Sequence, residues 1–372
     1  MPTITIANPF PTGLVAPVAD SQGLASLVGD SATFVARKYP IGEFFNWNLG
    51  IQREFRSSIM IEVSYAGSKG NKLAGPAIDL NALRPEQLAL GDGLRTLVPN
   101  PFFSKIKTGP LSTATVEQQV LLRAYPQFVS VSQQGIHDYF SNYHSFLLSV
   151  QNRLSAGFTI GGAYTLSKLI DNAPGNGEAG GGIQNVYNRA GEKSVSGEDI
   201  PQRLVVNYLY ELPFGPGKKH LSSGPMSVIL GGWEVSGIST FSKERPLGIT
   251  ATGGSFLPGT RRPNLVGDPN LPASDRTFLR WFNTSAFAFP ATAYALGNVS
   301  RTLSNTRRPG FQTWICRYRK TRESKKASIL NSALSFSMRS IKQISLRRIR
   351  SLAMRPSDRS QRHAHHDRFS LR

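Results

Sequence analysis

The chain is dominated by stretches in which apolar and polar side chains alternate. Trp47, Leu49 and Ile51 alternate with polar or small residues, and Ile59–Ala66 repeats the pattern after the polar turn Arg53–Ser58. A period of two places successive side chains on opposite faces of a β-strand. The two stretches therefore predict a hairpin.

The same arrangement recurs twice farther along the chain. Tyr143–Gln151 and Phe158–Ser167 form a second pair, and Leu204–Tyr210 and Trp233–Phe241 form a third. A seventh strand is expected to start near Phe311. These segments predict an all-β fold built from antiparallel hairpins.

Connection length separates two kinds of all-β protein. Two of the hairpin turns are short, whereas Gly67–Asn142, Leu169–Pro201 and Ser242–Gly310 are long connections between hairpins. Long loops at one end and tight turns at the other are typical of an outer-membrane barrel, and strands near ten residues suit a tilted membrane crossing. The fold class favoured is an antiparallel sheet forming part of a large transmembrane β-barrel. A soluble β-sandwich, whose apolar face packs into a core, stays open as the alternative.

Aromatic residues near the strand ends add a candidate membrane feature. Aromatic side chains gather at membrane–water interfaces, where an apolar ring with a polar edge suits both environments. The interfacial candidates are Trp47, Tyr65, Tyr164, Tyr208, Tyr210 and Trp233.

Charge is distributed unevenly. The formal net charge is +20, but residues 315–372 alone hold 16 basic and 3 acidic side chains, which leaves +7 for residues 1–314. The basic balance therefore describes the C-terminal part and does not indicate a nucleic-acid partner for the rest. The single cysteine, Cys316, also lies in the tail, so residues 1–314 offer no disulfide, thiolate metal site or cysteine nucleophile.

The beginning of the sequence carries no secretory signal pattern, and no segment approaches the roughly 20 apolar residues of a membrane helix. Two interpretations stay open. Either the protein is cytoplasmic, or its true N-terminus precedes Met1.

Several segments, in a shared order over residues 8–314, resemble the TonB-dependent outer-membrane receptors with an Oar-like β-barrel. The matching segments are Trp47–Glu54, Val63–Gly70, Val98–Phe102, Leu122–Phe128, Tyr164–Lys168, Tyr210–Gly215, Gly231–Gly237 and Arg262–Pro269.

The resemblance implies a bacterial outer-membrane location and ligand uptake in the complete receptor. It covers only the later barrel strands, so the expected partners are outer-membrane lipid and the plug and earlier strands, which are absent from this chain. TonB would be contacted only through that missing plug. Long loops would face outside and carry selectivity for an unknown ligand. The chain alone is expected to transport nothing, because a sheet this short cannot close a barrel of the 22-stranded class.

The pattern changes after Trp314. Ile315–Arg372 is rich in Ser and Arg and is expected to be a disordered basic tail without strand alternation. A reading frame shifted by one base yields, with permitted codon choices, segments that resemble the family's closing strands. The hypothesis is therefore one lost base at the Trp314 codon, with residues 1–314 as partial barrel and 315–372 as frameshifted sequence.

Three other clusters resemble ligand-binding sites, but each is more simply explained as unspecialised loop or tail sequence. His363–Asp367 resembles a metal site but lies in the tail, and the glycine-rich Gly177–Gly182 lacks the lysine and Ser/Thr of a phosphate-binding loop. The acidic residues of one long loop are expected to be solvated charge rather than a Ca²⁺ site; they are Asp171, Glu178, Glu192, Glu198 and Asp199.

His137 and His144 have no Ser or Cys partner in a triad-like arrangement. We therefore expect no enzyme, no cofactor, no metal and no specific nucleic acid. Besides the receptor, a soluble secreted β-sandwich used for adhesion stays open as the alternative function.

Overall fold

Long antiparallel strands make up most of the fold, as the alternating pattern predicts. The computed structural model describes residues 23–37, 40–55, 58–107, 109–154, 157–173, 182–251, 259–322 and 330–334. The chain divides into two compact units. The insert unit comprises Met1–Lys38 and Pro76–Gly135, and the sheet unit comprises Tyr39–Gly75 and Ile136–Arg372.

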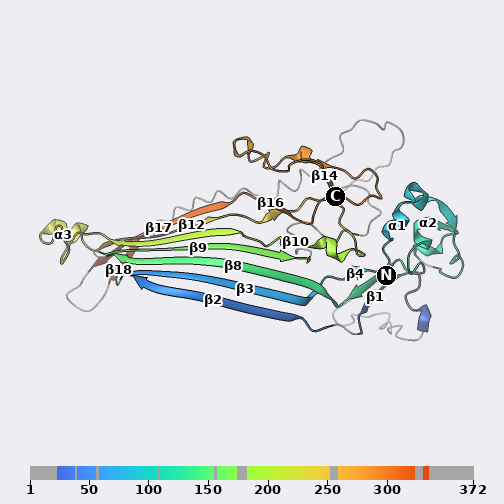
Figure 1. Ribbon diagram of the computed structural model, residues 1–372, viewed down its shortest axis with the longest axis horizontal. Helices are drawn as coiled ribbons and strands as arrows, with labels where there is room; N and C mark the ends of the chain where they lie inside the picture. The colour runs from blue at the N-terminus through green and yellow to red at the C-terminus, as the bar shows by residue number, and fades with distance from the viewer. Residues whose placement is uncertain are drawn as a thin grey trace, which may run out of the picture. The chain divides into compact units, whose positions relative to one another are not determined.

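One large sheet organises the sheet unit (Figure 1). Its strands are β2 (Glu43–Phe55), β3 (Ile59–Gly75), β8 (Ile136–Leu154), β9 (Phe158–Asp171), β11 (Gln202–Glu211), β12 (Trp233–Ser242), β17 (Phe311–Arg322) and β18 (Leu330–Leu334). They lie side by side in that order, each antiparallel to the next, with the short β10 (Ser194–Val195) added on β9. The three predicted hairpins are confirmed, and β17 is the seventh strand predicted near Phe311.

The register gives the sheet an apolar face and a polar face. Residues directly opposite each other in antiparallel strands share a face. One line of paired residues crosses the apolar face through Ile51, Val63, Leu148, Tyr164, Leu204 and Phe241. The neighbouring line crosses the polar face through Gln52, Glu62, Ser149, Ala163, Val205 and Thr240. On the apolar face Leu49 and Ile51 are 70% and 72% exposed, so no other described part of the chain covers them.

The sheet is open. Within the described residues, β2 and β18 each pair on one side only. Seven of the strands have ten or more residues, which at about 3.3 Å per residue is enough for a tilted crossing of an apolar membrane core.

The predicted boundary at Trp314 falls inside a strand. β17 runs without interruption from Phe311 to Arg322 and pairs with β12 from Ser242↔Phe311 to Trp233↔Lys320. Cys316 and Tyr318 continue the apolar face while Arg317 and Arg319 fall on the polar face, with Ile315 and Lys320 as the exceptions to this alternation. The expectation of a structureless tail is therefore wrong for residues 315–322, and β18 pairs with Tyr318–Arg322 of that segment. The remaining tail lies outside the described residues.

Short turns and long connections lie at opposite ends of the large sheet (Figure 1). At one end β2 turns into β3 and β8 into β9, and the connection from β11 to β12 contains the helix α3 (Pro225–Leu230). At the other end lie the long connections, two of which match the predicted Leu169–Pro201 and Ser242–Gly310 within a few residues. Among the described residues, no helix has the length and apolar character required to cross a membrane.

The predicted loop Gly67–Asn142 is wrong in extent. β3 continues to Gly75 and β8 begins at Ile136, because the two extensions pair with each other although neither alternates apolar and polar residues. Most of the chain between them is not an irregular loop but belongs to the insert unit.

The insert unit is a small fold with its own strands. Its strands are β1 (Ser31–Val35), β4 (Ile78–Asp79), β5 (Leu97–Pro99), β6 (Thr115–Glu117) and β7 (Ser130–Gln134). Its helical turns are η1 (Gly23–Ala25), α1 (Pro85–Leu88), η2 (Gly91–Arg95), η3 (Pro110–Ser112) and α2 (Gln118–Leu121). β7 lies between a parallel β1 and an antiparallel β4, and β5 pairs with β6.

Two buried asparagines hold the insert unit together. The Asn81 amide donates to the carbonyl oxygens of Tyr125 and Phe128, both at 2.9 Å, and its oxygen accepts from the Tyr125 backbone. The Asn100 amide donates to the carbonyl oxygens of Leu111 and Thr113 at 2.8 and 2.7 Å. Such side-chain bonds satisfy loop carbonyl groups that no strand partner reaches.

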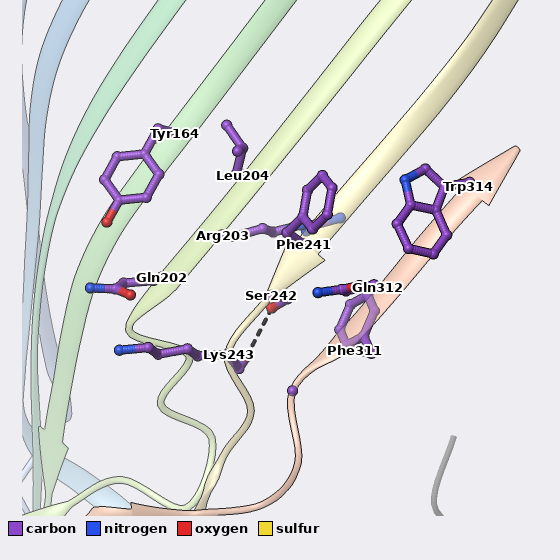
Figure 2. A pocket seen from close by; sticks show the side chains of 11 residues that line it. Tyr164, Gln202, Arg203, Leu204, Phe241, Ser242, Lys243, Phe311, Gln312 and Trp314 are labelled. Atoms are coloured by element: carbon purple, nitrogen blue, oxygen red, sulfur yellow. Dashed lines mark hydrogen bonds between the residues drawn. The ribbon is translucent and has the colours of Figure 1, made fainter. Parts of the chain in front are cut away.

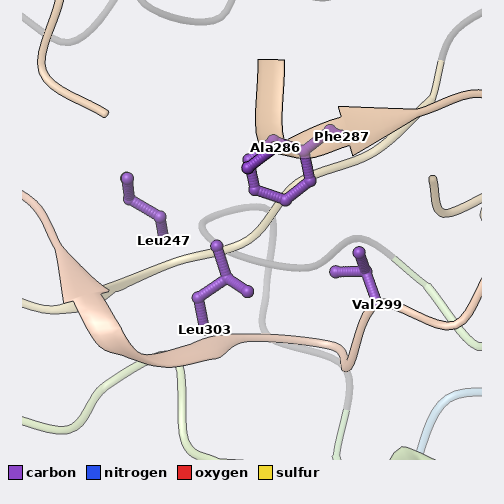
Figure 3. Packing of buried hydrophobic residues seen from close by; sticks show 5 residues of the cluster. All are labelled: Leu247, Ala286, Phe287, Val299 and Leu303. Atoms are coloured by element: carbon purple, nitrogen blue, oxygen red, sulfur yellow. The ribbon is translucent and has the colours of Figure 1, made fainter. Parts of the chain in front are cut away.

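The two other long connections fold against each other. We call residues 172–201 and 243–310 together the loop platform. Besides β10, it contains β13 (Pro246–Leu247), β14 (Asn264–Leu265), β15 (Phe287–Ala288), β16 (Leu303–Arg307), η4 (Arg189–Glu192), η5 (Ala273–Asp275) and η6 (Thr284–Ala286). β13 pairs with β16 and β14 with β15. Its apolar core consists of Leu247, Ala286, Phe287, Val299 and Leu303 (Figure 3).

Candidate functional site

Ion pairs join the two halves of the loop platform and tie them to β9. Arg262 reaches Glu192 at 2.5 Å, and both side chains are 3% exposed or less. Arg301 pairs with Asp171 at the end of β9. These contacts connect residues 70 and 130 positions apart in the chain.

A third pair extends the same contact. Arg307 reaches Asp199 at 2.7 Å, and a second nitrogen of the guanidinium donates to the Asp199 carbonyl oxygen at 3.1 Å. The Asp199 carboxylate also accepts the Leu169 backbone N–H at 2.6 Å. At the margin, Arg245 reaches Glu198 at 2.6 Å, but these side chains are 31% and 52% exposed.

Burial shapes the electrostatics of these pairs. Removal from water lowers the pKa of the Arg301 guanidinium, and the Asp171 carboxylate opposes that shift. Arg301 also donates to the Glu192 carbonyl oxygen at 3.2 Å. A buried charge stays favourable only when partners of opposite charge and hydrogen bonds replace the lost water. The platform supplies both.

The acidic cluster therefore corrects one prediction. Solvated loop charge is the wrong description of Asp171, Glu192 and Asp199, because distant arginines bury and neutralise them. Glu198 is paired but half exposed, and Glu178 lies outside the described residues. The described part of the chain contains no group of acidic, His or Cys side chains that could hold a metal ion.

All six interfacial aromatic candidates lie on the apolar face. Their strand positions share parity with the line through Val63, Leu148 and Tyr164. Tyr208, Tyr210 and Trp233 lie toward the short-turn end, whereas Trp47, Tyr65 and Tyr164 lie farther toward the long connections. A role at the membrane interface stays a prediction for each of them.

Local contacts orient several of these rings. The Tyr65 hydroxyl lies 2.7 Å from Nδ1 of His144, and the Trp47 ring packs edge-on against the same imidazole at 6.2 Å between centroids. The Lys320 ammonium lies 5.5 Å from the Trp233 ring centroid. His144 thus lies on the apolar face with Leu148, as the alternation predicts, and its contacts with Trp47 and Tyr65 were not predicted from the sequence.

Two strand glycines make room for candidate rings. A Cβ at Gly67 would collide with the Trp47 indole, and one at Gly237 would lie 2.5 Å from the Tyr208 hydroxyl oxygen. Gly67 stands directly opposite Trp47 in the register, and Gly237 stands directly opposite Tyr208. Their absent side chains therefore let the rings lie flat on the sheet.

A cavity opens near the long-connection end of the apolar face (Figure 2). It has a volume of about 590 Å³ and is lined from β9, β11, β12 and β17. Its lining includes the side chains of Tyr164, Gln202, Leu204, Phe241, Lys243 and Trp314. Phe241 and Trp314 meet edge to face with ring centroids 5.9 Å apart. Of these residues, only Tyr164 is among the site residues predicted from the sequence.

The remaining residues that the sequence suggested for catalysis or binding form no site in the described part of the chain. His137 lies 3.2 Å from the Lys72 carbonyl oxygen, far from any triad arrangement in the described structure. Gly177–Gly181, the His363–Asp367 cluster and the basic Leu346–Arg372 run lie outside the described residues.

Comparison with known families decides the class of protein. The family model described as an outer membrane beta barrel domain matches residues 1–324. The chain belongs to the outer membrane beta barrel domain family. The fold class predicted from alternation is thereby confirmed, and this barrel-family chain is an outer-membrane protein. Neither the curated proteins nor the solved structures contain a match.

Membership gives the two faces of the sheet their environments. Barrel strands of this family turn apolar residues toward lipid and polar residues toward the interior. The apolar face through Ile51 and Leu148 is then the lipid face, and the polar face through Gln52 and Ser149 lines the interior. The matched range extends ten residues past Trp314, which agrees with the continuation of β17.

Proposed function

We propose that this chain forms part of the barrel of a TonB-dependent outer-membrane receptor with an Oar-like β-barrel. In the complete receptor, the barrel would take up a ligand across the outer membrane. The observation that carries the proposal is the open sheet of long strands with one lipid face, one polar face and a folded loop platform at one end.

The open sheet supports a partnership with further strands. The outer edge of β2 has 13 residues, and unpaired backbone groups in lipid cost several kcal/mol each. Strands from the rest of the receptor would satisfy that edge and the one at β18. The plug and the earlier barrel strands are thus the proposed partners, with outer-membrane lipid on the apolar face and TonB contacted only through the plug. No specific nucleic-acid partner is proposed.

The loop platform supports a role in ligand selection. It is cross-linked by buried ion pairs and has an apolar core, so it presents a defined surface rather than independent loops. Folded long loops at one end of a barrel are the parts that contact molecules outside the cell. The ligand itself is unknown, and we propose neither catalytic activity nor a cofactor.

The frameshift hypothesis stays a separate proposal for the C-terminal residues. The family match ends at residue 324, and the basic run lies beyond it. We propose that the sequence beyond Trp314 derives from the loss of one base, so that β17 forms on residues whose alternation survives the change of frame.

Two measurements test these proposals. The nucleotide sequence should place a plug with a TonB-contact segment in frame upstream of Met1, and a lost base at the Trp314 codon. A locus without plug-coding sequence would overturn the receptor assignment, and early stop codons in the shifted frame would overturn the frameshift.

Solution behaviour provides the second test. The full chain should become monodisperse in detergent micelles and aggregate in plain buffer, because its apolar face needs lipid. A monodisperse species without detergent would instead support a soluble secreted β-sandwich used for adhesion.

A further inference from the structure

The cavity on the lipid face combines two chemistries. Leu204, Phe241 and Trp314 provide an apolar wall, whereas Tyr164, Gln202 and Lys243 bring polar ends to its margin (Figure 2). We propose that this cavity binds the phosphate-bearing headgroup and upper acyl chain of an anionic membrane lipid. The inference rests on membership of the barrel family and does not depend on the TonB-dependent assignment.

Position favours a lipid over a soluble ligand. Phe241 pairs with Leu204 and Leu204 pairs with Tyr164, so the wall belongs to the face that contacts lipid. The cavity lies at the ends of β11 and β12 nearest the long connections, where the apolar band gives way to headgroups. Acyl chains therefore reach the wall from the membrane without any entry path through the protein.

Backbone contacts hold the polar margin in place. The Lys243 N–H donates to the Gln202 carbonyl oxygen at 3.0 Å, and the Ser242 hydroxyl donates to the Lys243 carbonyl oxygen at 2.8 Å. Figure 2 shows the Lys243 ammonium, the Gln202 amide and the Tyr164 hydroxyl at the same end of the cavity. These three groups are hydrogen-bond donors, and one carries a full positive charge.

Charge selects the class of headgroup. Lys243 is exposed, and no ion pair to its ammonium occurs among the described residues. Arg203 pairs with Ser242 and Thr165 on the polar face, so Lys243 is the cation that this side of the sheet offers to the cavity. A lysine beside an anionic lipid surface contributes roughly a fivefold preference. An uncharged or zwitterionic headgroup would gain much less from the same donors.

Tryptophan quenching in vesicles tests the proposal. The full chain is reconstituted in phosphatidylcholine vesicles, and either brominated phosphatidic acid or brominated phosphatidylcholine is added as the quencher. The difference in quenching between the unmodified chain and Trp314→Phe reports contact of the lipid with the cavity. At equal lipid fraction, we expect this difference to be roughly fivefold larger for brominated phosphatidic acid than for brominated phosphatidylcholine. Equal quenching by both lipids would overturn the proposal.

Variants locate the preference. Lys243→Ala should reduce the preference to about one, whereas Lys243→Arg should retain it because the charge remains. The matched control is Lys168→Ala, which removes an exposed lysine from the same face outside the cavity. Equal losses in Lys243→Ala and Lys168→Ala would show general surface attraction and overturn the site. Competition by millimolar inorganic phosphate would overturn the lipid assignment in favour of a free-anion site.

Discussion

The large sheet and the loop platform are stabilised in opposite ways. The sheet exposes its apolar side chains, such as Leu49 and Ile51, and depends on lipid to cover them. The platform buries its own core around Phe287 and neutralises its charges internally, as Arg262 does with Glu192. One chain therefore contains a part that needs a membrane and a part that carries its own interior.

The largest expected effect comes from a substitution that removes a buried ion pair of the platform. Arg301→Ala removes the cation that neutralises the Asp171 carboxylate. Loss of one partner of a buried ion pair lowers the free energy of unfolding by about 3–5 kcal/mol. Hydrogen exchange over residues 259–310 should accelerate, while exchange in β3 and β8 should not.

The exposed pair supplies the control for that change. Arg245→Ala removes a partner from Glu198 at the margin and should cost about 0–1 kcal/mol. Replacement of both members of the buried pair, Arg301→Met with Asp171→Leu, should recover much of the loss. Equal effects of Arg301→Ala and Arg245→Ala would contradict the description of a buried pair.

The next effect distinguishes the two faces of the sheet. Leu148→Arg places a charge on the lipid face, where the cost ranges from about 0–1 kcal/mol near the interface to about 2–4 kcal/mol at the bilayer midplane. Ser149→Arg, one residue along on the polar face, should cost far less. Folding yield into vesicles, followed by urea titration, measures both. If Ser149→Arg were the more damaging change, the assignment of faces would be reversed.

A smaller effect concerns ring packing on the lipid face. Gly237→Ala brings a Cβ against the Tyr208 ring and to 2.9 Å from the Ile315 carbonyl oxygen, and overpacking of this kind costs about 1–3 kcal/mol. Gly162→Ala is the matched control, because its Cβ would meet only Val205 oxygen at 3.9 Å. Unfolding in detergent compares the two variants; similar stabilities would mean that Tyr208 moves aside without cost.

The smallest effect concerns the short-turn end. Lys320→Met removes the ammonium beside the Trp233 ring and should cost about 0.5–1 kcal/mol. Urea unfolding in detergent should show this loss, and in Trp233→Leu the same lysine substitution should have a smaller effect. An unchanged loss in the Trp233→Leu background would assign the effect to the bond from Lys320 to the Ile229 carbonyl oxygen.

The hairpins were predictable from local alternation, whereas contacts between residues far apart in the sequence were not. The strands around Trp47, Phe158 and Trp233 follow from a period of two that each segment carries by itself. The ion pairs of the platform were not predictable, since Arg301 lies 130 residues from Asp171 and nothing in either segment marks the other. The same holds for Asn81, whose partner carbonyl groups lie 44 and 47 residues away.

The continuation of β17 past Trp314 was missed for a different reason. Arg317 and Arg319 made the segment look like the start of a basic run, although Cys316 and Tyr318 between them maintain the period of two. Positive side chains are tolerated on the polar face of a barrel strand, so total charge was a poor guide there and periodicity a good one.

The order of the strands has a consequence for the path of folding. The pairs β2–β3, β8–β9 and β11–β12 are hairpins that can zip from their turn ends, whereas β3 pairs with β8 across 61 to 93 residues and β12 with β17 across 69 to 87. The contacts of the platform span 70 to 130 residues and carry a larger loop-closure entropy until β9, β11 and β12 are aligned. We therefore expect the platform to form after the three hairpins that it ties together.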